Sequence, residues 1–207
     1  DLVLRGRAPQ GLLTSYDVER GQAADENLRA STHSTDFIAP HSAQERRLRH
    51  AVLSLACDTA FARRMVNGGR LSTPSRYDTP LSTPDAAPWP GGPPPGAPMP
   101  DAPLADAEGR EIFLTDAFQA ATRACSGGFV LVEAANGAAA PVPEGVGHVR
   151  IGNGAPLADR DRLFAQRYAA APGAAYLLRP DGYVAARFRA PTREAIATAV
   201  ARATGRA

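Results

Sequence analysis

The stretch YLLRPDGYVAARF, residues 176–188, decides the fold of the chain. Two apolar runs flank Arg179-Pro180-Asp181-Gly182, and proline, aspartate and glycine are the residues that tight turns use. Strands joined by so short a turn pair antiparallel, so residues 176–178 and 183–188 are predicted to form a β-hairpin. A lone hairpin is marginally stable, and the flanking sequence is therefore expected to supply more strands and helices.

The sequence around the hairpin supplies those elements. Residues 129–132, Phe-Val-Leu-Val, suit a central buried strand, and residues 148–151 suit another strand. The remaining predicted elements are a strand at 112–114, helices at 116–124 and 160–168, and a last helix capped by Thr192. The order β-α-β-α-β-β-α predicts an α/β (α+β) fold with a small mixed sheet and flanking helices.

Residues 72–103 differ in composition and are predicted to form a linker strap. The chain has 19 Pro and 19 Gly, and this segment holds many of them, as in Gly91-Gly92-Pro93-Pro94-Pro95-Gly96. Because proline removes backbone donors, the expected conformation is extended, with little hydrogen-bonded ladder. Trp89, the single tryptophan, is expected to pin the strap to a domain surface rather than stack on a ligand.

Residues 1–71 are predicted to be helical. Ser42-Ala43-Gln44-Glu45 fits a capping box at the start of a second helix in this segment. The apolar stripe of that helix centres on Leu48 and Leu55, and Asn67-Gly68-Gly69 is expected to end it. These helices offer one apolar face only, so they are expected to need a partner surface.

The charge balance argues against a polyanion-binding surface. The 23 basic and 21 acidic residues give a net charge of +2, whereas nucleic-acid binding requires a clustered basic excess. Arginine supplies all the basic residues other than histidine, which indicates a GC-rich bacterial genome. No apolar stretch approaches the roughly 20 residues of a membrane span, and no secretory signal is present. We expect a cytoplasmic protein with neither nucleic acid nor membrane as a partner.

Cysteine and histidine are the candidates for redox or metal chemistry. Cys57 and Cys125 lie far apart and show no metal-ligand spacing, so free thiols are expected. His33 and His41 flank Asp36, but no third ligand has helical or hairpin spacing, which favours a polar loop over a metal site.

The adjacent charges of Glu19 and Arg20 lie on the first predicted helix. We interpret them as holding that helix against a neighbouring domain by ion pairing, which is a structural role rather than a catalytic one.

Three motifs follow one another along the chain: Val3–Arg20, with LRGRAP and LLTSYDVER; the strap segments Tyr77–Leu81 and Pro95–Leu104; and Leu178–Ala185. Together they resemble FAD-dependent aromatic hydroxylases of the 3-(3-hydroxyphenyl)propionate, phenol and polyketide hydroxylase type. Each motif alone is weak, and their order is what makes the resemblance specific.

The resemblance implies a thioredoxin-like domain at 104–207, after a helical flank at 1–71 and the strap at 72–103. It also implies FAD and NAD(P)H for the full-length enzyme, an aromatic substrate and a homodimer. The pyrophosphate-binding glycine turn and the flavin-contacting segment of such enzymes would precede Asp1. An N-terminal FAD domain is therefore the expected partner of residues 1–207. We assign no catalytic, cofactor-binding or metal-binding residue to these 207 residues.

Thiol redox chemistry is the least favoured function. It needs an activated thiolate on the helix after the central strand. Residues 133–137, which follow that strand, hold no cysteine, and Cys125 lies before the strand. The favoured hypothesis is the C-terminal part of an FAD- and NAD(P)H-dependent monooxygenase that hydroxylates an aromatic ring, with a structural or dimerisation role for this part. The alternative is a stand-alone thioredoxin-like binding or scaffold module without redox activity.

Overall fold

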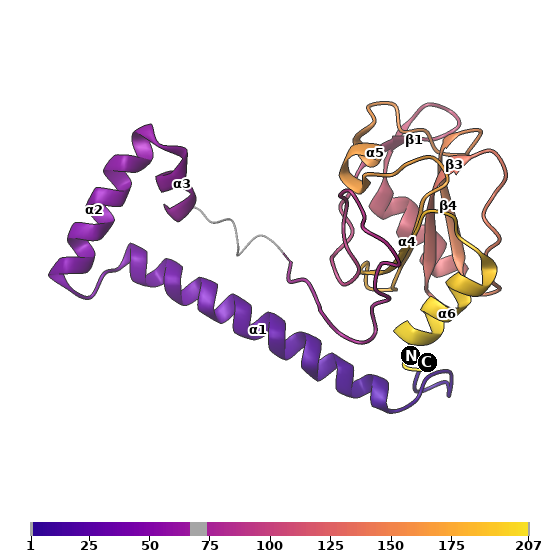
Figure 1. The fold of residues 1–207 in the computed structure, drawn as a ribbon, viewed down its shortest axis with the longest axis horizontal. Helices are drawn as coiled ribbons and strands as arrows, with labels where there is room; N and C mark the ends of the chain where they lie inside the picture. Colours follow the sequence, from indigo (N-terminus) through magenta and orange to yellow (C-terminus); the bar gives the residue numbers. More distant parts are fainter. Residues whose placement is uncertain (1, 67–73, 207) are drawn as a thin grey trace. The chain divides into compact units, whose positions relative to one another are not determined.

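The computed structural model of the chain describes residues 2–66 and 74–206 (Figure 1). Its contacts divide the chain into two compact units. Asp1–Ser15 and Arg76–Ala207 form the first, which we call the α/β unit, and Tyr16–Ser75 form the second, the helical unit.

The α/β unit is built on a four-stranded mixed sheet with the strand order β4-β3-β5-β6. Its strands are β3 (Val130–Asn136), β4 (Gly147–Asn153), β5 (Ala175–Leu178) and β6 (Val184–Phe188). β3 and β4 run parallel, while β5 is antiparallel to both β3 and β6. The predicted hairpin is confirmed, and its turn closes with the Gly182 amide donating to the Arg179 carbonyl at 2.9 Å. The predicted α/β fold with a small mixed sheet is likewise confirmed.

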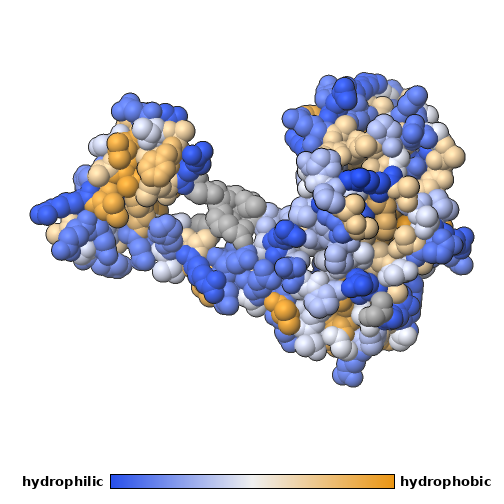
Figure 2. Space-filling model, in the orientation of Figure 1, coloured by the Kyte–Doolittle hydropathy of each residue, from blue (hydrophilic) through white to orange (hydrophobic). Residues whose placement is uncertain are grey.

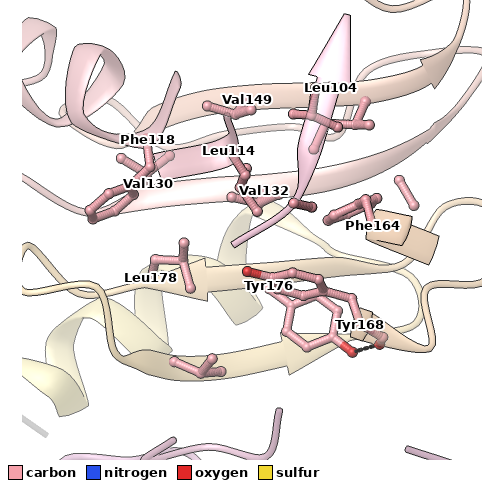
Figure 3. Close-up of a cluster of buried hydrophobic side chains, with 14 residues drawn as sticks. Leu104, Leu114, Phe118, Val130, Val132, Val149, Phe164, Tyr168, Tyr176 and Leu178 are labelled. Atoms are coloured by element: carbon pink, nitrogen blue, oxygen red, sulfur yellow. Dashed lines mark hydrogen bonds between the residues drawn. The ribbon is translucent and has the colours of Figure 1, made fainter. Parts of the chain in front are cut away.

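Helices cover both faces of this sheet. α4 (Leu114–Ala124) and α5 (Leu163–Tyr168) pack on one face, in the core cluster that Figure 3 shows, and α6 (Arg193–Ala203) packs on the other. The first cluster buries Phe118 and Phe164 against β3, and the second buries Ile196 against Leu131 and Leu177. Apolar side chains on both faces explain why 129–132 is apolar without alternation.

Two local features differ from the sequence prediction. β1 (Pro103–Ala105) is not among the predicted strands; it pairs antiparallel with β2 (Glu111–Phe113) in a separate two-stranded sheet. α5 begins at residue 163 rather than 160, because Arg162 has a left-handed backbone with φ 56°. The Asp159 carboxylate then accepts the amides of Phe164 and Ala165 at 3.1 and 2.9 Å, which satisfies the start of the helix.

The strap follows the free edge of β6. The Val184 amide donates to the Ala97 carbonyl at 2.9 Å, and the Gly96 and Thr83 amides donate to the Val184 and Ala185 carbonyls at 2.8 Å. These are single bonds rather than a regular ladder, as the proline content predicts. They cover an edge that would otherwise present unpaired backbone groups.

The helical unit contains α1 (Gly11–Ile38, which begins in the α/β unit), α2 (Ala43–Asp58) and α3 (Ala60–Val66). The predicted capping box is confirmed, since Ser42 Oγ accepts the Glu45 amide at 3.1 Å and Glu45 Oε2 accepts the Ser42 amide at 2.8 Å. The helix breaks at Thr59, which is extended. The predicted cap at 67–69 lies outside the described residues.

The predicted apolar centre of α2 is not a core. Leu48 and Leu55 are 60% and 52% exposed, and of the described residues of α2 only Val52 is buried. The sequence carries a hydrophobic stripe here, but the described residues of the helical unit do not bury it.

Candidate functional site

A partly buried charge cluster of the α/β unit lies on the sheet itself. Glu133 is paired in register with Arg150 across the parallel strands β3 and β4, and His148 lies two residues earlier on the same side of β4. Glu133 Oε2 accepts His148 Nε2 at 2.7 Å and Arg150 Nε at 3.1 Å. The glutamate is only 3% exposed, so its charge is satisfied by these partners rather than by water.

The same cluster holds the segment that connects β3 to β4. Glu133 Oε2 also accepts the Ala140 amide at 3.3 Å, and Arg150 Nη2 donates to the Gly137 carbonyl at 2.6 Å. The glutamate therefore acts as a brace between the sheet and this connection. None of these residues is among the predicted site residues, although His148 and Arg150 alternate with Val149 and Ile151 in a period of two, which signals one polar and one apolar face.

A second cluster fixes the strap to the sheet around Trp89. The guanidinium carbons of Arg187 and Arg189 lie 4.9 and 5.6 Å from the centre of the indole ring, and Asp85 accepts two bonds from Arg187 at 2.5 and 2.7 Å. Trp89 also packs edge-on against Tyr176, with ring centroids 5.9 Å apart. The predicted anchoring role of Trp89 is confirmed by these contacts.

Two buried tyrosines continue this cluster into the core (Figure 3). Tyr176 donates its hydroxyl to the Tyr168 carbonyl, and Tyr168 donates to the Pro100 carbonyl at 2.7 Å. Burial raises the pKa of the Tyr168 phenol, and burial likewise raises the pKa of Tyr176 against an opposing effect of Arg187. Both phenols therefore stay protonated near neutral pH and serve as hydrogen-bond donors.

An open pocket of about 520 Å³ lies between the strap and α6. Arg76, Asp78 and Arg202 supply its charges together with Asp85, whose carboxylate already pairs with Arg187. The rest of the lining is Thr79, Pro80, Ser82, Pro84, Pro94 and Pro95.

The thiol and metal candidates stay dispersed. Cys57 and Cys125 are both free. His41 lies 3.6 Å from Asp36 on the surface. Within 2–66 and 74–206, no group of three His, Cys, Asp or Glu side chains could hold a metal ion.

Of the predicted helical ion pair, Glu19 is buried and Arg20 is exposed.

Among the described helices, none is long and apolar enough to cross a membrane.

Two short glycine runs, Gly91-Gly92 and Gly152-Asn153-Gly154, do not form a phosphate cradle. Gly92 has a φ of 69°, and a Cβ there would lie 2.2 Å from the Tyr168 carbonyl oxygen, so this glycine serves close packing. Gly152 and Gly154 lie at the end of β4 and are followed by a turn, not by a helix. A dinucleotide site needs the run between a strand and a helix N-terminus.

A mixed four-stranded sheet with helices on both faces and a proline-rich strap along one edge defines a small α/β domain. The family model described as "Aromatic-ring hydroxylase, C-terminal" matches residues 92–207. The chain belongs to this family, and the resemblance to FAD-dependent aromatic hydroxylases is thereby confirmed. No curated protein matches the sequence.

Solved structures of flavoenzymes share the fold. The flavin-dependent monooxygenase PieE, in complex with FAD and substrate, matches with a TM-score of 0.59 and 22% identity over 100% of this chain and 42% of its own. Aklavinone-11 hydroxylase, with FAD and aklavinone, matches with a TM-score of 0.62 and 24% identity over 99% of this chain and 37% of its own. The rebeccamycin biosynthetic enzyme RebC, with reduced flavin, matches with a TM-score of 0.62 and 21% identity over 100% of this chain and 38% of its own. The chain thus spans about two fifths of these structures.

Proposed function

We propose that the chain is the C-terminal part of an FAD- and NAD(P)H-dependent monooxygenase that hydroxylates an aromatic ring. The observation that carries the proposal is the coverage of the structural matches. Three flavoenzyme structures align with 99–100% of this chain, yet the chain spans only 37–42% of each. The family description adds that the matched part is C-terminal.

In this proposal the flavin supplies the oxygen-transfer chemistry, and it is held by an N-terminal FAD domain. Residues 1–71 flank the flavin and substrate domains, 72–103 form the strap, and 104–207 form a thioredoxin-like domain with a structural or dimerisation role. The strand order β4-β3-β5-β6 supports a thioredoxin-like arrangement. The connection after β3, which would carry the redox thiols of such a domain, contains no cysteine.

Purification of the natural gene product tests the proposal. The expected result is a polypeptide longer than 207 residues, with a flavin absorption band and with NAD(P)H oxidation that an aromatic substrate stimulates. Hydroxylated product should appear in step with that oxidation.

The alternative is a stand-alone binding or scaffold module. It predicts a natural polypeptide that begins at or near Asp1 and carries no flavin. Intact-mass measurement and N-terminal sequencing distinguish the two, and a complete 207-residue product would overturn the flavoenzyme proposal.

A further inference from the structure

The α/β unit presents little apolar surface to another domain. Most of the large exposed apolar side chains of the described residues lie on α1, α2 and α3, and Figure 2 shows hydrophobic surface gathered over this part of the molecule. In the proposed function that surface lies against the flavin and substrate domains. Among the described residues 76–206, by contrast, Phe113 is the one large apolar side chain that is exposed. This range therefore presents no exposed apolar patch for attachment, whereas it already contacts the N-terminal segment of the chain.

Residues 2–7 have the hydrogen-bond pattern of a helix end. The Arg7 amide donates to the Leu2 carbonyl at 2.8 Å, and the Gly6 amide donates to the Val3 carbonyl at 3.0 Å. Gly6 has a left-handed backbone, with a φ of 67°. This pair of bonds, closed over a left-handed glycine, is the Schellman motif, in which α-helices commonly end. The segment is therefore shaped as a last helical turn.

Part of this turn contacts the α/β unit. Leu2 packs against the hydrophobic cluster that includes Ile196 of α6. Arg7 Nη1 donates to the Ser126 carbonyl at 2.7 Å. Leu4 of the same turn is 92% exposed, so the contact uses only some of the surface of the turn.

The carbonyl that accepts from Arg7 lies in a closely packed loop. Ser126 belongs to the connection between α4 and β3, and the Gly127 amide after it donates to the Gly145 carbonyl at 2.9 Å. A Cβ at Gly127 would lie 2.6 Å from that carbonyl oxygen, so the two backbones approach as closely as glycine allows. Arg7 therefore binds a carbonyl that is fixed by backbone contacts, which lowers the entropy cost of the contact.

We propose that residues 2–7 are the C-terminal end of a helix that belongs to the preceding domain, and that the α/β unit binds this helix end. The α/β unit is then joined to that domain directly, and not only through the helical unit and the strap. The identity of that domain as the FAD domain rests on the proposed function. The contact itself belongs to the 207-residue chain, so the two can fail independently.

Substitutions in the 207-residue chain test the contact. Leu2→Asp with Arg7→Ala removes both interactions with the α/β unit. Urea unfolding followed by the signal of Trp89 should show a midpoint lowered by about 0.5 M or more. The matched control, Leu4→Asp with Gln10→Ala, changes two exposed residues nearby and should leave the midpoint unchanged. If the first variant does not fold, Arg7→Ala alone decides by the same criterion, with a smaller decrease. An unchanged midpoint, or an equal decrease in the control, would overturn the proposal.

The natural polypeptide tests the link to the preceding domain. A ligand that binds only the native state stabilises every part coupled to its site, so bound FAD should slow amide hydrogen exchange in β5. In the variant Leu2→Asp with Arg7→Ala, saturated with FAD, most of this slowing should be lost. The amides just before Asp1 should exchange slowly, as those of a helix do.

Fast exchange before Asp1, or a β5 that responds to FAD equally in both proteins or in neither, would contradict the proposal. A natural polypeptide without FAD would instead contradict the proposed function. The urea measurement on the 207-residue chain would then still decide whether the α/β unit binds the helix end.

Discussion

Gly92 shows at the scale of one residue how the strap is fitted to the sheet. Its φ of 69° is a conformation that glycine adopts freely, and a Cβ would lie 2.2 Å from the Tyr168 carbonyl oxygen and 2.7 Å from the Tyr176 hydroxyl. Gly92→Ala should therefore destabilise the α/β unit by about 3–4 kcal/mol, from backbone strain together with overpacking. Urea unfolding followed by the signal of Trp89 measures this loss.

Gly173→Ala is the matched control for that substitution. Gly173 has a similar backbone, with a φ of 86°, but a Cβ added there would meet no other atom within 4 Å. Only the strain of a left-handed alanine remains, so the expected loss is about 1–2 kcal/mol. An equal loss of unfolding free energy in the two variants would show that close packing of the strap at Gly92 contributes nothing to stability.

Ala169 presents the opposite case, since it is a non-glycine residue with a φ of 46° at the C-terminal end of α5. Glycine is the residue that such caps favour. Ala169→Gly should stabilise the protein by about 0.5–1 kcal/mol, because the relief of backbone strain exceeds the added chain entropy of the unfolded state. Thermal unfolding should show a rise of about 1–4 °C in Tm.

The control for that gain is Ala165→Gly in the same helix. Helical backbone gives glycine no advantage there, and the expected result is a loss of about 0.5–1 kcal/mol. A gain at both positions would contradict the role of the left-handed cap.

At the scale of elements, the hydrogen bonds and ion pairs of Glu133 join β3, β4 and the connection between them. Glu133→Gln removes the charge that balances Arg150, which is only 19% exposed in its side chain. Because an uncompensated buried charge is costly, the expected loss is about 2–4 kcal/mol in the free energy of unfolding, measured in urea at pH 7. Glu144→Gln, an exposed change in the same connection, should alter stability by less than about 0.5 kcal/mol.

Strong local signals made several elements predictable. The hairpin turn at 179–182 and the capping box at Ser42 are each satisfied within a few residues, so neighbouring sequence suffices to specify them. The strand β1 pairs with β2 across the short turn at 106–110, but three residues beginning with Pro103 carry no periodicity that predicts a strand. The late start of α5 depends on the left-handed backbone of Arg162, which an arginine in the sequence does not indicate.

The charge clusters were predictable only in part. Trp89 stood out as the single tryptophan of a proline-rich segment, and an apolar anchor was the physical need of that segment. Glu133 and Arg150 are 17 residues apart, and their pairing follows from the register of two parallel strands. Sequence spacing specifies a helix or a hairpin, whereas it does not specify which residues face each other across a parallel pair.

At the scale of the whole molecule, the two units differ in how they are stabilised. Both hydrophobic clusters lie in the α/β unit, to which Leu2 also contributes, and Arg7 donates to the Ser126 carbonyl at 2.7 Å. Among described residues of the helical unit only four are buried, namely Glu19, Val52, Ala62 and Ser75. The α/β unit therefore has its own core, whereas the described residues of the helical unit bury few side chains.

That difference predicts the result of removing the helical unit. A chain in which residues 16–75 are replaced by a flexible Gly/Ser linker should keep the fold of the α/β unit. Since the denaturant slope m scales with the surface exposed on unfolding, the cooperative transition should keep its midpoint and nearly its slope when few buried residues are removed. Near-UV circular dichroism of Trp89 and urea unfolding measure both quantities.

The shortened chain should also self-associate less than the 207-residue chain, because the large exposed apolar side chains of α2 and α3 lie in the segment removed. A shortened chain that is unfolded would show that the helices support the α/β core. One that is folded but self-associates as much as the 207-residue chain would show that the exposed apolar side chains of α2 and α3 do not cause the association. The two measurements therefore separate what stabilises the fold from what causes self-association.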